Sequence, residues 1–495
     1  MRIGMPGARV AGACRFPPRL LFRPYGSPPP RFLILFSRTP PALPGDTALT
    51  CAGRRLQEVR RRCGHGAGVV SYAKLRDPFA HFPSFTVKLG QAAAAPSLRT
   101  RMLYAAPEHP PGPQGEARRP RLRVLDGLRL LAALMVLAYH YITLRDGWGD
   151  DPNAFSPVVY HLSEYGWLGV EVFFLISGFV ICMSAWGRSL GDFVTSRVSR
   201  LYPAYWVAVL LTAAVLTVWP NVRSADNWET VLTNLTMLQQ GVGVPDVDDA
   251  YWTLFIELKF YLLFAIVVFR GVTYRRCVLF CGLWTVAGVV ALKSNSDLLS
   301  VWAIAPYSPY FIAGIAFYLM HRFRPTVLLW AIVAVSFLLA QHYLRGRLVM
   351  NLGAKADMAH GWPVRLAVLL AFALMAAIAL GWFDKLQWRW LSTAGSLTYP
   401  LYLLHMYVGF TLIDLLRSRV PAAVLLPGIV AFMLALSWAV HRLVERPLGK
   451  KLRVSMQKSV EEMRFHSRGR MSGAPPAKQR EIIREERKPD PELLH

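Results

Sequence analysis

Apolar runs of about 20 residues recur between residues 124 and 443, and they constrain the fold of this chain more than any other feature. A helix of this length crosses the hydrocarbon core of a bilayer. Ten segments qualify: 124–144, 166–185, 203–219, 252–269, 277–292, 300–320, 326–344, 363–382, 395–413 and 422–441. The fifth and sixth are the least distinct, because only the short loop 293–299 separates them. The sequence predicts an all-α integral membrane protein with about ten transmembrane helices.

The net charge of +26 is typical of nucleic-acid-binding proteins, but its distribution along the chain is not. Residues 1–101 alone contain 17 Lys and Arg residues against three acidic ones. Much of the remaining excess lies in loops between the apolar runs, as the positive-inside rule expects. No nucleic-acid-binding motif is present, so we expect no nucleic-acid partner.

The charges of the loops predict the topology. Basic residues cluster before the first span, at 118–123, and after the last, at 442–453, which places both termini in the cytoplasm. Two acidic loops are predicted to lie outside, at 145–165 and 220–251. Two further loops disobey the rule, because they are predicted to lie outside and yet contain basic residues: 345–362 and 414–421.

The two ends of the chain differ from its apolar middle. Residues 1–120 are basic and rich in Pro and Arg, which predicts a disordered N-terminal extension, and Met102 is a plausible true start. Residues 121–450 form the predicted membrane domain. Residues 451–495 are charged and predict a mostly disordered cytoplasmic tail, in which 478–488 could form a short surface helix.

The first apolar run contains Arg129 near its start and His140 near its far end. At about 100° and 1.5 Å per residue, they lie on one helix face, roughly 16 Å apart along the axis. Ionisable residues inside a span are costly unless they face a protein interior or a wet cavity, so both are candidate functional residues. The alternative is that Arg129 extends to the lipid headgroups and His140 is a packing residue.

Two carboxylates are predicted at a depth similar to that of His140. Glu171 and Glu257 each lie about five residues, or ~8 Å, from the outer end of their spans. Three ionisable residues at one depth predict a common polar cavity, with His140 as a base and a carboxylate to orient it. The alternative for Glu257 is a pair with Lys259 near the interface.

Arg197 and Arg200 stand at the cytoplasmic end of the third span, three residues apart. On a helix they project from one side, a spacing suited to binding phosphates. Ordinary positive-inside anchoring explains them equally well. The six cysteines include no CxxC pair, so we expect no metal site.

Six segments together resemble the membrane-bound acyltransferase family 3, whose members O-acetylate O-antigens, exopolysaccharides and other carbohydrates. The segments, in chain order, are LDGLRLLAALMVLAYH, GWLGVEVFFLISGFVI, SRVSRLYPAYW, YWTLFIELKFYLLF, SLTYPLYLLHMY and HRLVERPLGKKL. They cover residues 123–453. The resemblance implies that Arg129 and His140 are required for activity and that Arg197 and Arg200 lie on the acyl-CoA side. Glu257 stands at the acidic position of a family motif.

The resemblance implies an enzyme, an O-acyltransferase of the bacterial inner membrane. Its co-substrate would be acyl-CoA, most simply acetyl-CoA, with no bound cofactor, and its acceptor a carbohydrate or lipid-linked glycan. His140 would be the base or a transient acyl carrier, oriented by Glu257 or Glu171. Arg129 would stabilise the charge of the donor or the path of its pantetheine arm, and His405 would be a second polar group on the route. A transporter or flippase of a glycan or small anion is the main alternative, and a membrane scaffold is another.

Overall fold

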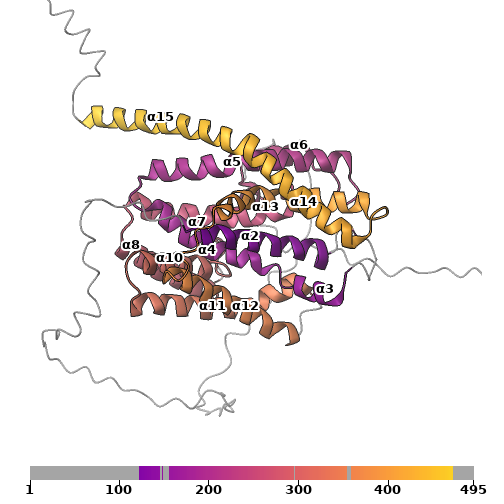
Figure 1. Cartoon of the computed structure of the whole chain (residues 1–495). Coiled ribbons are helices and arrows are strands. Elements are labelled where there is room, and N and C mark those ends of the chain that lie inside the picture. The colour runs from indigo at the N-terminus through magenta and orange to yellow at the C-terminus, as the bar shows by residue number, and fades with distance from the viewer. Residues whose placement is uncertain (1–121, 145–147, 149–154, 295, 354–357, 472–495) are drawn as a thin grey trace, which may run out of the picture. The chain divides into compact units, whose positions relative to one another are not determined.

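The structure, a computed structural model, describes residues 122–144, 148, 155–294, 296–353 and 358–471, and these residues contain helices but no strands. In chain order the elements are α2 (Arg123–Ala138), η1 (Tyr139–Leu144), α3 (Pro157–Ser163), α4 (Leu168–Ala185), α5 (Leu190–Val218), α6 (Trp228–Asn234), η2 (Gln239–Val242), η3 (Asp249–Tyr251), α7 (Trp252–Phe269), α8 (Tyr274–Ala291), α9 (Asp297–Ala303), α10 (Ser308–Arg322), α11 (Val327–Leu352), α12 (Met358–Ala379), α13 (Arg389–Leu416), α14 (Ala422–Val440), η5 (His441–Glu445) and α15 (Arg446–Met471). Most of the long helices run side by side in similar directions (Figure 1).

The number of spans agrees with the prediction from hydropathy. Nine helical segments of the described chain are long and apolar enough to cross a bilayer, and α9 and α10 make a tenth if the bent pair counts as one span. The pair is bent by 40° at Ile304, which has a positive φ of 48°. Helix α9 begins at Asp297, so the predicted loop 293–299 overlaps the first turn of a broken span, which explains why the sixth run is indistinct in the sequence.

Polar side chains fix where many of the helices begin. Ser, Thr and Asn side-chain oxygens at the N-cap position accept hydrogen bonds from backbone N–H groups that otherwise lack helical partners. The residues that do so are Ser156, Ser189, Asn227, Thr273, Ser296 and Thr326. Such caps are needed because the ends of spans meet the interface, where the first turn would otherwise leave its donors unpaired.

Helices α4 and α10 form the closest pair in the bundle. A Cβ added to Gly178 of α4 would collide with the carbonyl oxygen of Phe311, and one added to Gly314 of α10 would collide with that of Leu175. Small residues let transmembrane backbones approach this closely. Helix α10 also packs against α8, α11 and α12. Every residue from Ser308 to Met320 is buried, so protein surrounds α10 on all sides.

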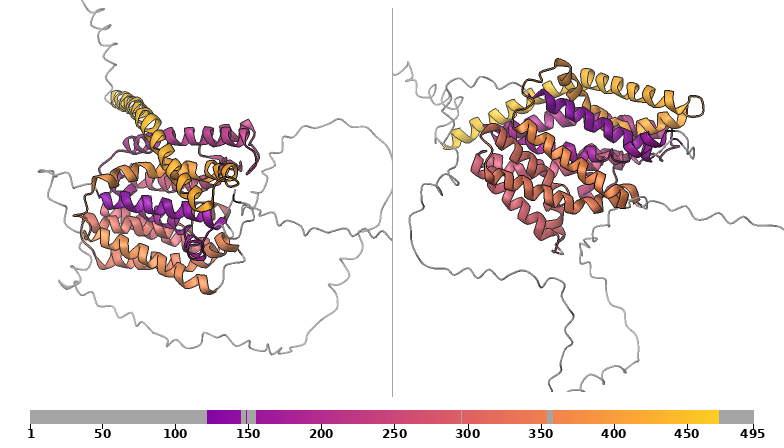
Figure 2. Two further views of the ribbon diagram at one scale, coloured as in Figure 1. Left: turned by 45° about the vertical axis from the view of Figure 1, so that its right-hand side comes forward. Right: turned by 60° about the horizontal axis from the view of Figure 1, so that its bottom comes forward.

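The segment after the last span differs from its prediction. Helix α14 continues through the π-helical turn η5 into α15, which runs to Met471 and packs along α5 (Figure 2). Leu452, Met456 and Val460 are spaced four residues apart and half-buried, so they form an apolar stripe on a charged helix. The predicted border between the membrane domain and the C-terminal tail, at residues 450 and 451, thus lies inside helix α15. The proposed surface helix 478–488 and residues 1–121 lie outside the described part of the chain.

The two loops that disobeyed the charge rule contain basic residues with protein partners. Helix α11 runs to Leu352, so Arg347 is part of a helix, and its side chain is buried and paired with Glu171. Arg417 directly follows α13, pairs with Asp414 at 3.3 Å and donates to the carbonyl of Trp148 at 2.9 Å. Lys355 lies outside the described residues. The cytoplasmic location of both termini remains a prediction.

Candidate active site

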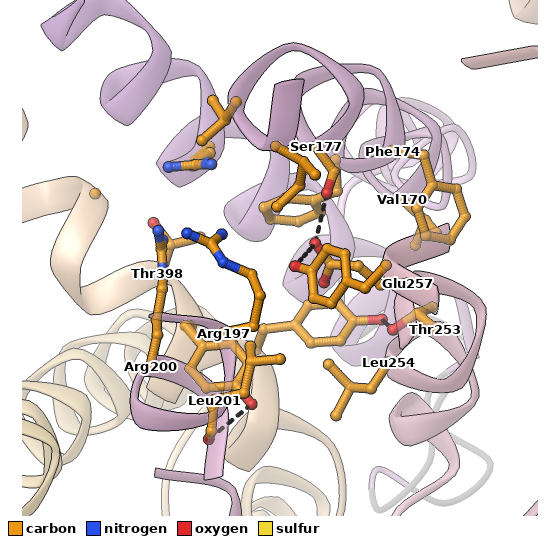
Figure 3. Close-up of a pocket in the computed structure, with 18 residues that line it drawn as sticks. Val170, Phe174, Ser177, Arg197, Arg200, Leu201, Thr253, Leu254, Glu257 and Thr398 are labelled. Atoms are coloured by element: carbon orange, nitrogen blue, oxygen red, sulfur yellow. Dashed lines mark hydrogen bonds between the residues drawn. The ribbon is translucent and has the colours of Figure 1, made fainter. Parts of the chain in front are cut away.

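A cavity of about 100 Å³ lies between five helices, α2, α4, α5, α7 and α13. Three arginines and one carboxylate line it, together with aromatic and hydroxyl side chains (Figure 3). The ionisable residues are Arg129, Arg197, Arg200 and Glu257, all four predicted from the sequence. His140 and Glu171 are not among the lining residues.

Arg197 and Arg200 reach the cavity from the same face of α5, as their spacing predicts. They lie beside each other, across from Glu257 (Figure 3). Arg197 is half-buried and donates through Nη2 to the Ser196 hydroxyl at 3.0 Å, whereas its buried Nε has no hydrogen-bond partner among the described residues. Arg200 is exposed. A half-buried guanidinium whose Nε–H is unpaired within the described part of the chain is suited to an anionic ligand.

Arg129 is held in place by a neighbour on its own helix. Its Nη1 lies 3.7 Å from Oδ1 of the buried Asp126, one turn earlier. Gly395 of α13 packs directly against Asp126, where a Cβ would come within 2.5 Å of the Asp126 Cβ. The sequence analysis did not select Asp126, although the i, i+3 spacing in LDGLR is a signal for such a pair.

Glu257 accepts two short hydrogen bonds at one oxygen. The Ser177 hydroxyl of α4 and the Tyr261 hydroxyl of α7 both donate to Oε1 at 2.5 Å. Lys259 does not pair with it; its Nζ lies 4.5 Å from the ring centre of Phe255. Residues two apart on a helix do not face each other, which explains why the alternative pair is absent.

His140 lies outside this cavity, in the π-helical turn η1 at the end of α2. Such turns are common at functional sites. Its Nδ1 lies 2.9 Å from the Val136 carbonyl oxygen and 3.1 Å from Nε2 of His405. His405 is fully buried on α13, and its Nδ1 lies 2.7 Å from the Tyr402 carbonyl oxygen. The two histidines, which the sequence placed on separate helices, form a direct pair.

Tyr402 connects the cavity with the histidine pair. Its ring lines the cavity, and its hydroxyl accepts a hydrogen bond from Thr253, another lining residue, at 2.9 Å. Its carbonyl oxygen contacts His405. A residue that lines the cavity therefore contacts His405, which in turn contacts His140.

Glu171 occupies a separate buried site, so the predicted common cavity of His140, Glu171 and Glu257 is not found. Arg347 of α11 donates through Nε to Oε1 of Glu171 at 3.0 Å, and both side chains are nearly inaccessible. The guanidinium also contacts three aromatic rings within 5.6 Å, those of Trp167, Trp252 and Tyr307. Three ionisable residues at one depth can face different neighbours, because depth does not fix the direction of a side chain.

Among the described residues, no group of three His, Cys, Asp or Glu side chains is placed to hold a metal ion. The fold and the site define a multi-span helical membrane protein with a cationic cavity between its helices and a buried histidine pair beside it. The chain belongs to acyltransferase family 3: the family model described as "Acyltransferase domain" matches residues 122–442. The resemblance seen in the sequence motifs is thereby confirmed.

Three relatives of known name support the same family. The chain is 29% identical over 180 residues to acyltransferase MdmB of Streptomyces mycarofaciens, covering 34% of this chain and 44% of that protein. It is 30% identical over 264 residues to the exopolysaccharide production protein ExoZ of Rhizobium meliloti, covering 50% of this chain and 78% of ExoZ. It is 27% identical over 159 residues to the peptidoglycan O-acetyltransferase OatA of Listeria monocytogenes, covering 28% of this chain and 23% of OatA. The match thus spans less than half of MdmB and of OatA. No solved structure matches the chain.

Proposed function

We propose that the protein is an O-acyltransferase of the bacterial inner membrane. It would transfer an acyl group, most simply acetyl, from acyl-CoA to a hydroxyl group of a cell-envelope or exported carbohydrate. The observation that carries the proposal is the cavity lined by Arg129, Arg197 and Arg200, next to a histidine pair. The relatives ExoZ, an exopolysaccharide production protein, and OatA, a peptidoglycan O-acetyltransferase, support a carbohydrate acceptor.

The arginines suit the phosphates of acyl-CoA. Guanidinium groups bind phosphate oxygens through charge-assisted hydrogen bonds, which are stronger than those between neutral groups. Arg197 and Arg200 would bind the phosphates from the cytoplasm, and Arg129, deeper on α2, would bind charge further along the donor. Glu257 keeps the cavity from being purely cationic. Its position among the arginines favours a role in shaping the field around the donor, and we assign no step to Glu171.

The pantetheine arm of acyl-CoA would extend from the arginines past Tyr402 toward His140. His140 would take the proton of the acceptor hydroxyl as the oxygen attacks the thioester carbonyl. The new C–O ester bond forms, the C–S bond breaks, and the proton leaves with the thiolate as CoA–SH. If His140 instead carries the acyl group, the same two bonds are exchanged in two steps through an acyl-imidazole.

The test uses the purified full-length protein in lipid vesicles, with acetyl-labelled acetyl-CoA and glycans isolated from a cell envelope that lacks the gene. Mass spectrometry of the glycans should show the addition of acetyl groups, dependent on both acetyl-CoA and His140. If the wild-type protein moved glycans across the vesicle membrane without esterifying them, the proposal would be wrong and the transporter alternative would hold.

A further inference from the structure

The buried histidine pair permits an assignment of protons. The His405 Nδ1 lies 2.7 Å from a carbonyl oxygen, that of Tyr402, and a carbonyl oxygen can only accept. The Nδ1 of His405 therefore carries a hydrogen. Among the residues that the structure describes, no carboxylate forms a hydrogen bond or ion pair with His405, and an unpaired charge is costly at a fully buried position. The neutral ring that results has its lone pair on Nε2.

The same reasoning applies to His140. Its Nδ1 faces two acceptors, the Val136 carbonyl oxygen at 2.9 Å and the Nε2 lone pair of His405 at 3.1 Å. The hydrogen of His140 is therefore on Nδ1 and is shared between them. Its other ring nitrogen, Nε2, is left unprotonated, the state that a general base or an acyl-accepting nucleophile needs.

The orienting group in this site is thus an imidazole rather than a carboxylate. His405 is itself held on both sides: its Nδ1 binds the Tyr402 carbonyl, and the Tyr141 hydroxyl donates to its backbone carbonyl at 2.6 Å. Because Tyr141 directly follows His140, the two histidines are connected by side-chain and backbone contacts. We infer that His405 is a positioning residue that holds His140 in the tautomer with a free Nε2. This inference rests on the proposed function only for its effect on rate.

Two substitutions separate orientation from packing. His405→Phe keeps a ring of similar size but removes one of the two acceptors for the His140 Nδ1–H and leaves only the Val136 carbonyl oxygen. His405→Gln retains both contacts in principle, since its amide NH₂ can donate to Tyr402 and its oxygen can accept from His140. Tyr407→Phe, on the same helix, is the matched control. It removes the hydrogen bond that the Tyr407 hydroxyl donates to Asp249, and it leaves the contact between His140 and His405 unchanged.

The first readout is the tautomer itself, measured by ¹⁵N NMR of histidine-labelled full-length protein in lipid nanodiscs. The wild type should show His140 protonated at Nδ1, His405→Gln should keep that state, and His405→Phe should shift the population toward Nε2–H. A wild-type spectrum with His140 protonated at Nε2 would overturn the inference without any further variant. This measurement does not depend on whether the protein transfers acyl groups.

The second readout is the transfer rate in vesicles with acetyl-CoA. His405→Phe should lower kcat about 10–100-fold, by analogy with the loss seen when the partner that orients a metal-binding histidine is removed, with the KM for acetyl-CoA unchanged. His405→Gln should restore most of the rate, and Tyr407→Phe should stay close to wild type. Equal losses in His405→Phe and His405→Gln would mean that His405 acts only by packing. Absence of acyl transfer by the wild-type protein would contradict the proposed function but not the assignment of the His140 tautomer.

Discussion

The carboxylate of Glu171 and the guanidinium of Arg347, 176 positions apart in the chain, form a buried ion pair with an N–O distance of 3.0 Å. The pair joins α4 to α11 and explains why Glu171 does not share a cavity with His140. Removing one partner from such a pair leaves an uncompensated charge in the interior.

Arg347→Ala should therefore destabilise the fold by about 3–5 kcal/mol. The double variant Glu171→Gln with Arg347→Met should be considerably more stable than Arg347→Ala, because no buried charge remains. Thermal unfolding in detergent measures both. Arg345→Ala, at an exposed position two residues earlier on α11, is the control and should match the wild type. Equal stability of Arg345→Ala and Arg347→Ala would contradict a structural role for the pair.

Arg197→Ala and Arg200→Ala should weaken the use of acyl-CoA. A charge-assisted hydrogen bond contributes roughly 1.5–3 kcal/mol, so loss of the half-buried Arg197 should raise the donor KM at least about tenfold. The exposed Arg200 should have a smaller effect, because solvent screens it, and the double variant the largest. Donor saturation curves are the measurement, with Arg188→Ala as a control outside the cavity. Normal saturation in the double variant would show that these arginines only determine topology.

His140→Gln should abolish most of the transfer while leaving expression and membrane insertion intact. Glutamine keeps hydrogen-bonding capacity but does not take up a proton near neutral pH, and loss of a general base typically costs about 10²–10⁴-fold in rate. The assay is acyl transfer in vesicles supplied with acyl-CoA and acceptor. Retention of most of the activity would eliminate His140 as base or acyl carrier, even though the family assignment would stand.

Glu257→Gln should have a milder effect than His140→Gln. Glutamine can still accept from Ser177 and Tyr261, but the variant removes the negative charge opposite the arginines. We expect a lower donor KM together with a lower kcat, because the cavity becomes more cationic. Measuring the two constants separately tests this, and Ser177→Ala, which keeps the charge, should leave the donor KM close to wild type. A raised donor KM in Glu257→Gln would point to direct donor binding by Glu257.

Gly178→Ala should destabilise the bundle at the contact between α4 and α10. The added methyl group collides with the Phe311 carbonyl oxygen, and overpacking of this kind typically costs about 1–3 kcal/mol. Gly282→Ala on α8 is the control, since no atom lies within 4 Å of its added Cβ. Thermal unfolding should separate the two variants. A wild-type melting temperature for Gly178→Ala would mean that the two helices can move apart without cost.

The sequence predicts features that depend on local spacing. Hydropathy locates the spans because the length of an apolar run is a property of the run itself. The shared face of Arg197 and Arg200 follows from their three-residue interval. The three-residue interval between Asp126 and Arg129 likewise indicates a pair on one helix face. The four-residue spacing of Leu452, Met456 and Val460 indicates an apolar helix face, but the surrounding charged residues obscure it.

Features that depend on how helices pack were not predictable in this way. The pairing of His140 with His405 requires α2 and α13 to meet at one level, and no local pattern encodes that contact. Arg347 follows the apolar run predicted at 326–344, so the sequence assigns it to a loop and gives no sign that it pairs with Glu171. The π-helical turn at His140 likewise follows from tertiary packing, because its sequence has no Pro or Gly to mark it.

The burial of α10 has a consequence for how the protein is assembled. Its 15 residues reach only about 22 Å, short of a hydrocarbon core of about 30 Å, and the bend at Ile304 interrupts the span. Irregular backbone at that depth is tolerated only where protein covers it. The placement of this segment within the bilayer therefore depends on the helices packed around it, α4 among them, and α10 does not span the membrane as an independent unit.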